Sequence, residues 1–253
     1  MTNDFSMVWS FRNRIEVLID SIKGADKFCP KKVKFYLVDG ASDDEQIKKL
    51  RNFCSSINDR KIRICESDYR TTLWEAWNLG IMLTDSRWVI FSSSDVTFSG
   101  DTWLRNIEKC INNGGEYILV ENHQVFCLDK KIIPRIGWFD ENFVNGPHAD
   151  TDYFLRTDEN NINRMITGSE YTIKHGDTEN ESILRGQGKL ENRLPMDNLS
   201  NEEYFMKKWK SSWPGWKNHL NKSDRPHPPV YISQCKRQMN ETDPHPIWSK
   251  KFL

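Results

Sequence analysis

Three acidic residues in the first hundred positions follow apolar runs that are typical of buried strands. The segment WVIFSSSDVTF, which begins at Trp88, shows the pattern most clearly, because the apolar run changes to serines and then to an acid. A single acid in such a place is a common turn or cap residue. Parallel strands, however, open together at one edge of a sheet, where ligands bind. We therefore expect one crevice to hold all three carboxylates: Asp39, Asp68 and Asp95.

The chemistry of these residues suits a nucleotide and a cation. A fixed carboxylate accepts the ring N–H of a base such as uracil, and we assign this role to Asp39 and Asp68. Asp95 can bind Mn²⁺ or Mg²⁺, which prefers oxygen ligands and can neutralise a diphosphate. His175 ends the last predicted strand and is a candidate second metal ligand, although a lone histidine is often structural. Ser94, beside Asp95, is a candidate contact to the nucleotide.

Two further groups of residues are candidates for contacts with phosphate and sugar. Arg12 and Arg70 follow predicted strands at the same edge and can pair with phosphates, or with neighbouring acids on the surface. The turn-rich loop from Ile136 to Phe143 carries Trp138 and Asp140, which we assign to the sugar or acceptor. A tryptophan can stack on a sugar ring, but it can equally pack in the core.

A pair of carboxylates stands at the start of a predicted helix. Asp150 and Asp152 lie one residue apart in ADTDYFLR, and a carboxylate can remove the proton of an attacking sugar hydroxyl. The simpler explanation is the usual enrichment of acids at the positive end of a helix. His148 is an alternative base on chemical grounds.

The elements that must position these residues alternate between strand and helix through residue 98. Strands are predicted at Phe5–Phe11, Val33–Val38, Lys61–Cys65 and Trp88–Phe91. A first helix begins near Ile15 and should stop at Gly24, and Ser42 is a suitable N-cap for a second. A third helix spans about Thr72 to Leu83, with Leu73, Trp77, Gly80 and Ile81 facing inward. This alternation predicts a largely parallel sheet with helices on both faces.

The second half is less regular. A helix is expected at Trp103–Ile111, strands at Tyr117–Val120, Gln124–Leu128 and Tyr171–His175, and a helix that starts near Ala149. We expect one domain over residues 1–220, with a nucleotide-binding half (1–100) and an acceptor half (101–220). Residues 221–253 form a tail rich in Pro and His.

Composition narrows the classes of function. The 253 residues include 36 basic and 36 acidic side chains, so the zero net charge gives no reason to expect nucleic-acid binding. No apolar run approaches the roughly 18–20 residues of a membrane-spanning helix, and the first residues lack a basic-then-apolar signal. Six cysteines without CxxC spacing favour reduced thiols, so we expect a cytoplasmic protein.

Taken in order, the motifs resemble those of the GT-A-fold glycosyltransferases, most closely the inverting enzymes similar to family 2. The resemblance covers roughly residues 5–175 and extends weakly to about 216. The segments that carry it are SFRNR, VDGASDD, LWEAWNLGI, FSSSDVTF, GWFDENF, ADTDYFLR, KHG and YFMKKWK.

The resemblance implies a GT-A (Rossmann-like) fold: a mostly parallel central sheet flanked by helices, with a smaller mixed second half. It also implies transfer of a sugar from a nucleotide-diphosphate sugar, UDP-linked, to an acceptor hydroxyl with inversion, assisted by Mn²⁺ or Mg²⁺. By the same resemblance, Asp39 contacts the base, Asp95 binds metal together with His175, and Asp150 is the catalytic base. The sequence departs from the family pattern at Ser93, where the metal motif has a first acid, and at Ala149, where the base motif has a glutamate.

Two other functions stay open at this point. A nucleotidyltransferase could use a similar sheet, but such enzymes usually show a Gly-rich phosphate loop near the N-terminus, and SFRNR is not one. A non-catalytic module that binds nucleotide or carbohydrate would explain a metal motif with one acid.

Overall fold

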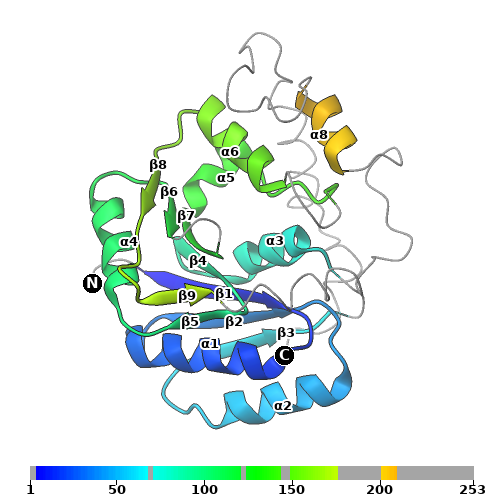
Figure 1. Ribbon diagram of the computed structural model, residues 1–253, viewed down its shortest axis with the longest axis vertical. Helices are drawn as coiled ribbons and strands as arrows, with labels where there is room; N and C mark the ends of the chain where they lie inside the picture. The colour runs from blue at the N-terminus through cyan, green and yellow to red at the C-terminus, as the bar shows by residue number, and fades with distance from the viewer. Residues whose placement is uncertain (1–3, 68–70, 121–123, 144–148, 176–200, 210–253) are drawn as a thin grey trace.

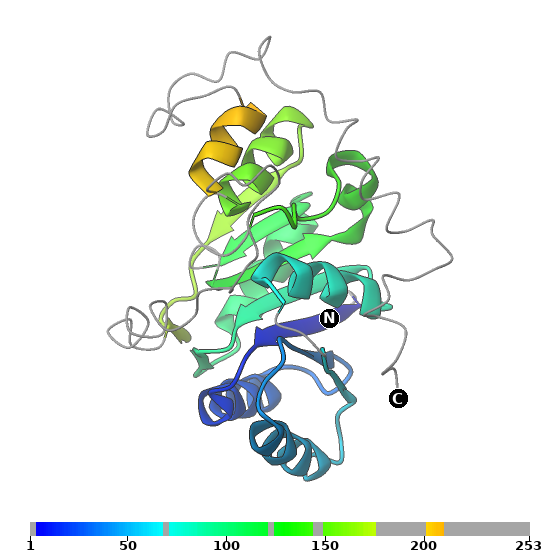
Figure 2. The same cartoon turned by 90° about the vertical axis from the view of Figure 1, so that its right-hand side faces the viewer.

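The computed structural model describes residues 4–67, 71–120, 124–143, 149–175 and 201–209. These residues form three layers, with helices on both faces of a central sheet (Figure 1 and Figure 2). The first half has the predicted alternation: β1 (Phe5–Phe11), α1 (Ile15–Phe28), β2 (Lys34–Asp39), α2 (Asp44–Ser55), β3 (Ile62–Cys65), α3 (Leu73–Leu83) and β4 (Trp88–Ser93). The short strand β5 (Val96–Phe98) follows directly.

The second half adds helices and strands to the same sheet. Its elements are α4 (Thr102–Asn112), β6 (Tyr117–Val120), β7 (Val125–Asp129), η2 (Lys130–Ile132), α5 (Ile133–Ile136), α6 (Ala149–Glu159), β8 (Arg164–Thr167), β9 (Ile173–His175) and α8 (Asn201–Trp209). Strand β8 was not predicted, because RMIT is too short and too polar in its flanks to stand out as a strand.

The central sheet has seven strands in the order β3-β2-β1-β4-β7-β6-β8. Every neighbouring pair is parallel except the two that involve β7, so β7 alone runs against the others. The predicted mostly parallel sheet with helices on both faces is therefore confirmed. The carboxyl ends of β1, β2 and β4 lie together at one edge, because these strands are parallel neighbours.

Side chains alternate along the strands and divide the core into two clusters. In β1, Val8 packs on the face covered by α3, α5, α6 and α8, whereas Met7 and Trp9 pack on the face covered by α1, α2 and α4. Because both faces are buried, the strand carries apolar residues on both of them rather than an alternation of apolar and polar residues.

Helix α1 continues past Gly24, where the sequence predicted a stop. A Cβ at Gly24 would lie 2.7 Å from the carbonyl oxygen of Phe98, so the glycine is needed for the close approach of β5 rather than to end the helix. The predicted N-cap Ser42 is also corrected: the cap position is Asp43, and the hydroxyl of Ser42 bonds to Asp39.

Helix α3 begins with a capping box. Thr72 accepts a hydrogen bond from the backbone N–H of Glu75 (3.1 Å), and the Glu75 carboxylate accepts one from the Thr72 N–H (2.6 Å). Trp77 and Ile81 face the core as expected, but Leu73, also predicted to face inward, is 39% exposed because it lies in the first turn on the outer side.

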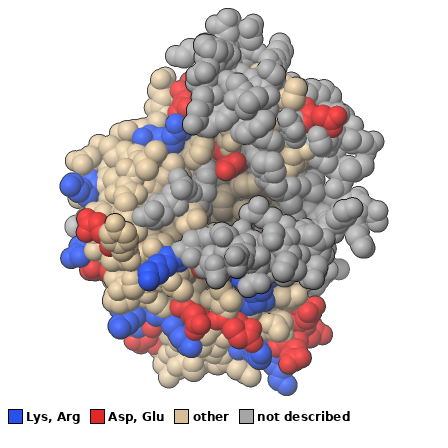
Figure 3. All heavy atoms as spheres, in the orientation of Figure 1, with Lys and Arg blue, Asp and Glu red and all other residues tan. Residues whose placement is uncertain are grey.

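A second, two-stranded sheet forms beside the first. Its strands, β5 and β9, pair antiparallel, with Val96 opposite His175 and Phe98 opposite Ile173. The predicted last strand therefore forms, but it does not join the central sheet. Among the described residues, no helix is long and apolar enough to cross a membrane. Basic and acidic side chains are interspersed over the α1 and α2 end of the face seen in Figure 3.

Candidate functional site

Asp39, the last residue of β2, is a buried carboxylate at the sheet edge. Its side chain accepts hydrogen bonds from the hydroxyl (2.5 Å) and the backbone N–H (3.1 Å) of Ser42, and the residue is only 2% exposed. Burial raises the pKa of Asp39, the bonds from Ser42 lower it in part, and the nearby charge of Glu66 raises it further. The carboxylate is therefore held in place but poorly solvated, which favours a ligand that donates a hydrogen bond.

The loops after β1 and β2 are locked together beside Asp39. The backbone N–H of Asn13 donates to the Ser42 hydroxyl (2.6 Å), and the Asn13 side chain accepts from the N–H of Asp43 (2.9 Å). Asn13 and Ala41 have positive φ angles of 52° and 64°, a conformation that is uncommon for residues other than glycine. Such backbone strain persists where surrounding contacts fix it, often at functional sites.

Two of the predicted donor-binding residues, Arg12 and Ser94, lie at this edge. Arg12 is exposed, and its Nε lies 3.4 Å from the carbonyl oxygen of Ala41. Ser94 lies in the turn between β4 and β5 and is half-buried. Asp68, Arg70 and the alternative base His148 lie outside the described residues.

The small sheet brings the backbone of His175 next to Val96, the residue that follows Asp95; His175 and Asp95 are the two predicted metal ligands. Asp95 is 7% exposed in the turn that follows β4, and the next residue, Val96, is the strand partner of His175. A carboxylate oxygen and an imidazole nitrogen suit Mn²⁺ or Mg²⁺. The described residues contain no group of three or more His, Cys, Asp or Glu side chains that could hold a metal. This donor set fits a cation whose other ligands come from a bound diphosphate and water.

The two acids of α6 have different surroundings. Asp150 is half-buried, and its Oδ1 accepts a hydrogen bond from the N–H of Thr151 (2.8 Å). Asp152 is completely buried and accepts from Arg156 Nε (3.0 Å), Trp209 Nε1 (2.8 Å) and Lys208 Nζ (2.5 Å). A carboxylate enclosed in this way has no access to an acceptor hydroxyl, which leaves Asp150 as the reachable acid of the pair.

Trp138 and Asp140 lie in the interior rather than on an open surface. Trp138 is 5% exposed and belongs to the core cluster under α3 and α6. Asp140 accepts from Tyr204 Oη (2.9 Å) and Lys208 Nζ (2.6 Å). Both residues therefore help to hold the loop at 137–143 in place, and their predicted contact with a sugar or acceptor stays a prediction.

Asn78, in α3, is a further residue that holds this loop, and the sequence analysis did not identify it. Its side-chain amide bonds to both backbone groups of Phe139 (2.9 Å each) and to the Glu141 carboxylate (2.8 Å). The motif LWEAWNLGI contains the residue, but an asparagine in a helix has no distinctive spacing that would reveal a partner 61 positions away.

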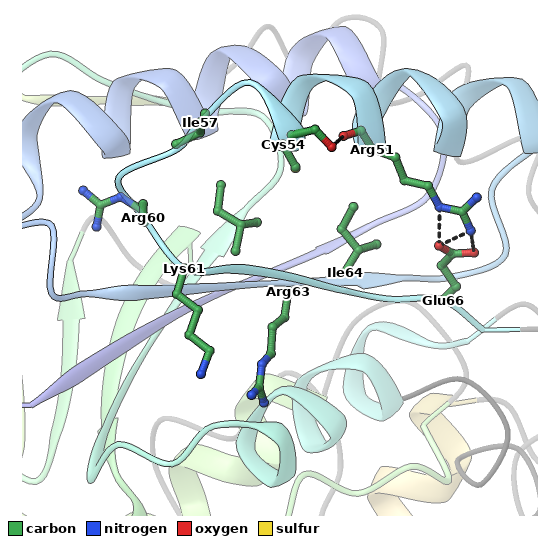
Figure 4. A pocket seen from close by; sticks show the side chains of 10 residues that line it. Arg51, Cys54, Ile57, Arg60, Lys61, Arg63, Ile64 and Glu66 are labelled. Carbon is green, nitrogen blue, oxygen red and sulfur yellow. Dashed lines mark hydrogen bonds and ion pairs between the residues drawn. The ribbon is translucent and has the colours of Figure 1, made fainter. Parts of the chain in front are cut away.

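A pocket of about 810 Å³ lies away from these residues, between α2 and the outer strand β3. Ile57, Cys54 and Ile64 line its apolar part, whereas Arg63 points to the other side of β3 (Figure 4). Arg51 forms a two-pronged ion pair with Glu66 at one end. Neither Asp39 nor Asp95 lines the pocket, but Glu66, at one end of it, is near enough to Asp39 to raise the pKa of that carboxylate.

The mostly parallel seven-stranded sheet with helices on both faces is the fold of the GT-A class. Residues 6–169 match the family model described as Glycosyl transferase family 2, so the chain belongs to that family. No curated protein sequence matches the chain significantly.

Solved structures with low sequence identity share the fold. A mannosyltransferase from Pyrobaculum calidifontis in complex with GDP-Man and Mn²⁺ has a TM-score of 0.63 at 12% identity, over 98% of this chain and 78% of that one. GalNAc-T7 with UDP, GalNAc and Mn²⁺ has a TM-score of 0.64 at 12% identity, over 96% of this chain and 55% of the other.

TarS from S. aureus also matches, both as a longer chain and as residues 1–349 in complex with UDP-GlcNAc. The UDP-GlcNAc complex has a TM-score of 0.55 at 13% identity, over 69% of this chain and 60% of that chain. Against the longer TarS structure, the match spans only 37% of the TarS chain. These likenesses establish the fold.

Proposed function

We propose that this protein is an inverting glycosyltransferase that moves a sugar from a UDP-linked donor to an acceptor hydroxyl. The observation that carries the proposal is the sheet edge of a family 2 chain, where buried Asp39 ends β2 and buried Asp95 follows β4, the two parallel strands on either side of β1. Asp39 accepts the ring N–H of the base, and the exposed Arg12 is available to the phosphates. UDP or a UDP-sugar is bound in two of the structural neighbours and GDP-Man in a third, and the choice of UDP follows the family resemblance of the sequence.

Asp150 acts as the general base in this proposal. Its carboxylate takes the proton of the acceptor hydroxyl, and the oxygen attacks the anomeric carbon from the side opposite the diphosphate. The new bond from carbon to the acceptor oxygen forms as the bond from carbon to the diphosphate oxygen breaks, which inverts the anomeric centre. Asp152, which the sequence placed beside it as a catalytic residue, instead anchors the helix that carries Asp150.

Asp95 and His175 would hold Mn²⁺ or Mg²⁺ when the donor is bound. The cation would neutralise negative charge on the departing diphosphate. Ser93 replaces the first acid of the family motif, so this proposal assigns the cation to these two candidate ligands.

The test begins with the donor. We would measure thermal unfolding of the whole chain against UDP, GDP and their sugar conjugates, each with and without Mn²⁺. A ligand at about 100 times its dissociation constant adds roughly 2.7 kcal/mol, which is readily detected. We expect a UDP-sugar to raise the unfolding temperature most, and to do so only with Mn²⁺.

The same donor is then used to measure transfer or donor hydrolysis. Asp150→Asn should lower kcat by about 10²- to 10⁴-fold, the usual contribution of a general base, and should leave the donor-induced thermal shift intact. Asp158→Asn is the matched control, since Asp158 lies on the same helix in an exposed ion pair with Arg164. Normal turnover by Asp150→Asn would refute the assignment, and donor binding without any turnover would favour a non-catalytic module.

A further inference from the structure

Helix α8, near the end of the described chain, docks on the candidate site through one face. The buried residues of this helix are Tyr204, Phe205, Lys208 and Trp209, which fall at the i, i+1, i+4 and i+5 positions of a single stripe. The ring of Tyr204 packs edge-on against Phe143, 5.0 Å between centroids. The helix therefore covers the loop at 137–143 and the start of α6.

Lys208 is the charged residue of this face, and it bridges two segments that are distant in sequence. Its ammonium lies 2.6 Å from Asp140 Oδ2 and 2.5 Å from Asp152 Oδ1, and its side chain is 1% exposed. Asp140 belongs to the loop, whereas Asp152 belongs to the first turns of α6. One buried cation thus holds the loop and the helix at a fixed separation.

Arg156 completes the network and balances its charge. Its Nη2 lies 2.8 Å from Asp152 Oδ2, and its Nη1 donates to the carbonyl oxygens of Ile136 (2.7 Å) and Trp138 (2.6 Å). Two buried carboxylates therefore meet two buried cations. Removing one member would leave a buried charge without compensation, so the network has one strongly preferred geometry.

The network influences the position of Asp150, because that residue lies two positions before Asp152 in α6. Asp152 is bonded on both of its carboxylate oxygens, which fixes the rotation and the height of the first turn of the helix. A general base must lie within hydrogen-bond reach of the proton that it removes, and a displacement of about 1 Å can cost roughly 100-fold in rate.

We infer that Lys208 is a positioning residue for sugar transfer: it fixes the first turn of α6 against the 137–143 loop and thereby places the Asp150 carboxylate. This inference rests on the proposed function, in which Asp150 is the base. Lys208 acts through its two ion-pair partners, Asp140 and Asp152.

The test compares Lys208→Met with Lys208→Arg in the full chain. The methionine keeps most of the side-chain volume and removes the charge, and we expect kcat to fall by about 10- to 100-fold with little change in the KM for the donor. The arginine keeps the charge and should recover part of the loss. Arg60→Met is the matched control, because Arg60 is equally buried and ion-paired, with Asp26, at the far end of the fold.

A double-mutant cycle with Asp150→Asn separates positioning from a general loss of stability. If Lys208 acts through Asp150, Lys208→Met should cause little further loss of residual activity in the Asp150→Asn background. An equal loss in both backgrounds, or a loss no greater than that of Arg60→Met at a temperature where both variants are folded, would overturn the inference.

Trp209→Phe keeps the inference testable should Lys208→Met not fold. This change removes the 2.8 Å indole bond to Asp152 and some buried volume, and it keeps an aromatic ring in place. We expect a several-fold lower kcat at unchanged donor KM, and an unchanged kcat would overturn the inference. Absence of turnover in the wild-type protein with every donor would instead refute the proposed function, and the positioning role would fall with it.

Discussion

At the residue scale, the buried charge of Asp39 lowers the stability of the ligand-free protein, although the same charge can bind a ligand. Its carboxylate is almost fully buried and has Ser42 as its hydrogen-bonding partner at the sheet edge, while Glu66 adds a repulsive charge nearby. Burial raises its pKa, which means that the folded chain binds a proton on Asp39 more tightly than the unfolded chain does. An N–H donor from a nucleobase would compensate for the lost solvation.

We predict that Asp39→Asn raises the unfolding temperature of the ligand-free protein near pH 7.5 by about 2–4 °C, the shift that ~1 kcal/mol produces in a chain of this size. The amide avoids the cost of burying a charge. Because the raised pKa makes wild-type stability increase as the pH falls toward and below the folded pKa, the difference between the two proteins should shrink in acid.

Thermal unfolding between pH 4 and 8 measures this effect, with and without UDP. Asp59→Asn, an exposed acid away from this loop, is the control and should change neither the unfolding temperature nor the shift induced by UDP. The asparagine at position 39 should also reduce the shift induced by UDP. A lower unfolding temperature at every pH, together with an undiminished UDP shift, would contradict the role given to Asp39.

At the scale of elements, the close packing of α1 on β5 depends on a residue without a side chain. A Cβ on Gly24 would lie 2.7 Å from the carbonyl oxygen and 3.0 Å from the nitrogen of Phe98, both backbone atoms that cannot rotate away. Strand β5 begins one residue after Asp95 and pairs with β9, which ends at His175. The position of α1 therefore affects the strand pair that adjoins the candidate metal ligands.

We predict that Gly24→Ala destabilises the protein by about 1–3 kcal/mol, the usual cost of overpacking a well-packed core, despite the higher helix propensity of alanine. Gly168→Ala is the control, because its Cβ would meet only one atom, at 4.0 Å, and should change stability by less than about 0.5 kcal/mol. Urea unfolding measures the free energy of unfolding of both variants. Equal stability of the two variants would show that β5 can move away without cost.

At the scale of the whole molecule, buried charges join segments from opposite ends of the second half. Lys208 reaches Asp140 across 68 positions, and Trp209 reaches Asp152 across 57. Burial raises the pKa of Asp140, but the ammonium of Lys208 and the hydrogen bonds to the carboxylate outweigh it, so the net pKa lies below the usual value. The ionised carboxylate therefore contributes to the stability of the folded chain.

We predict that Asp140→Asn lowers the free energy of unfolding at pH 7 by about 3–5 kcal/mol, as expected when one partner of a buried ion pair is removed. A lowered folded pKa gives stability that is present above the ordinary carboxyl pKa and is lost as the pH falls through the folded value. The difference between wild type and variant should thus be full at neutral pH and should decrease below about pH 4.

Urea unfolding at several pH values tests this prediction. Asp20→Asn provides the comparison, since Asp20 forms an exposed pair with Lys23 and should leave stability nearly unchanged at each pH. A difference between wild type and Asp140→Asn that stays constant from pH 7 to pH 3 would be inconsistent with an ionised Asp140 in the folded chain.

The sequence by itself determined the elements and the edge where a ligand binds. Apolar runs and helical spacing are local properties, so β1 to β4 and α3 were predicted to within about two residues at each end, whereas α1 continues past its predicted stop. The parallel arrangement follows from the alternation of strand and helix, and it places Asp39 and Asp95 at one edge. The order of the motifs also indicated the family that the family model identifies.

Only the tertiary structure decided which polar residues are enclosed. Trp138, Asp140 and Asp152 have the residue types of a sugar-binding or catalytic site, yet each is buried by α8 or by the core, and α8 lies more than 40 positions further along the chain. In the same way, Gly24 could not be distinguished from a helix stop until Phe98 was found against it. Burial and close approach depend on partners distant in sequence, and a local pattern carries no information about those partners.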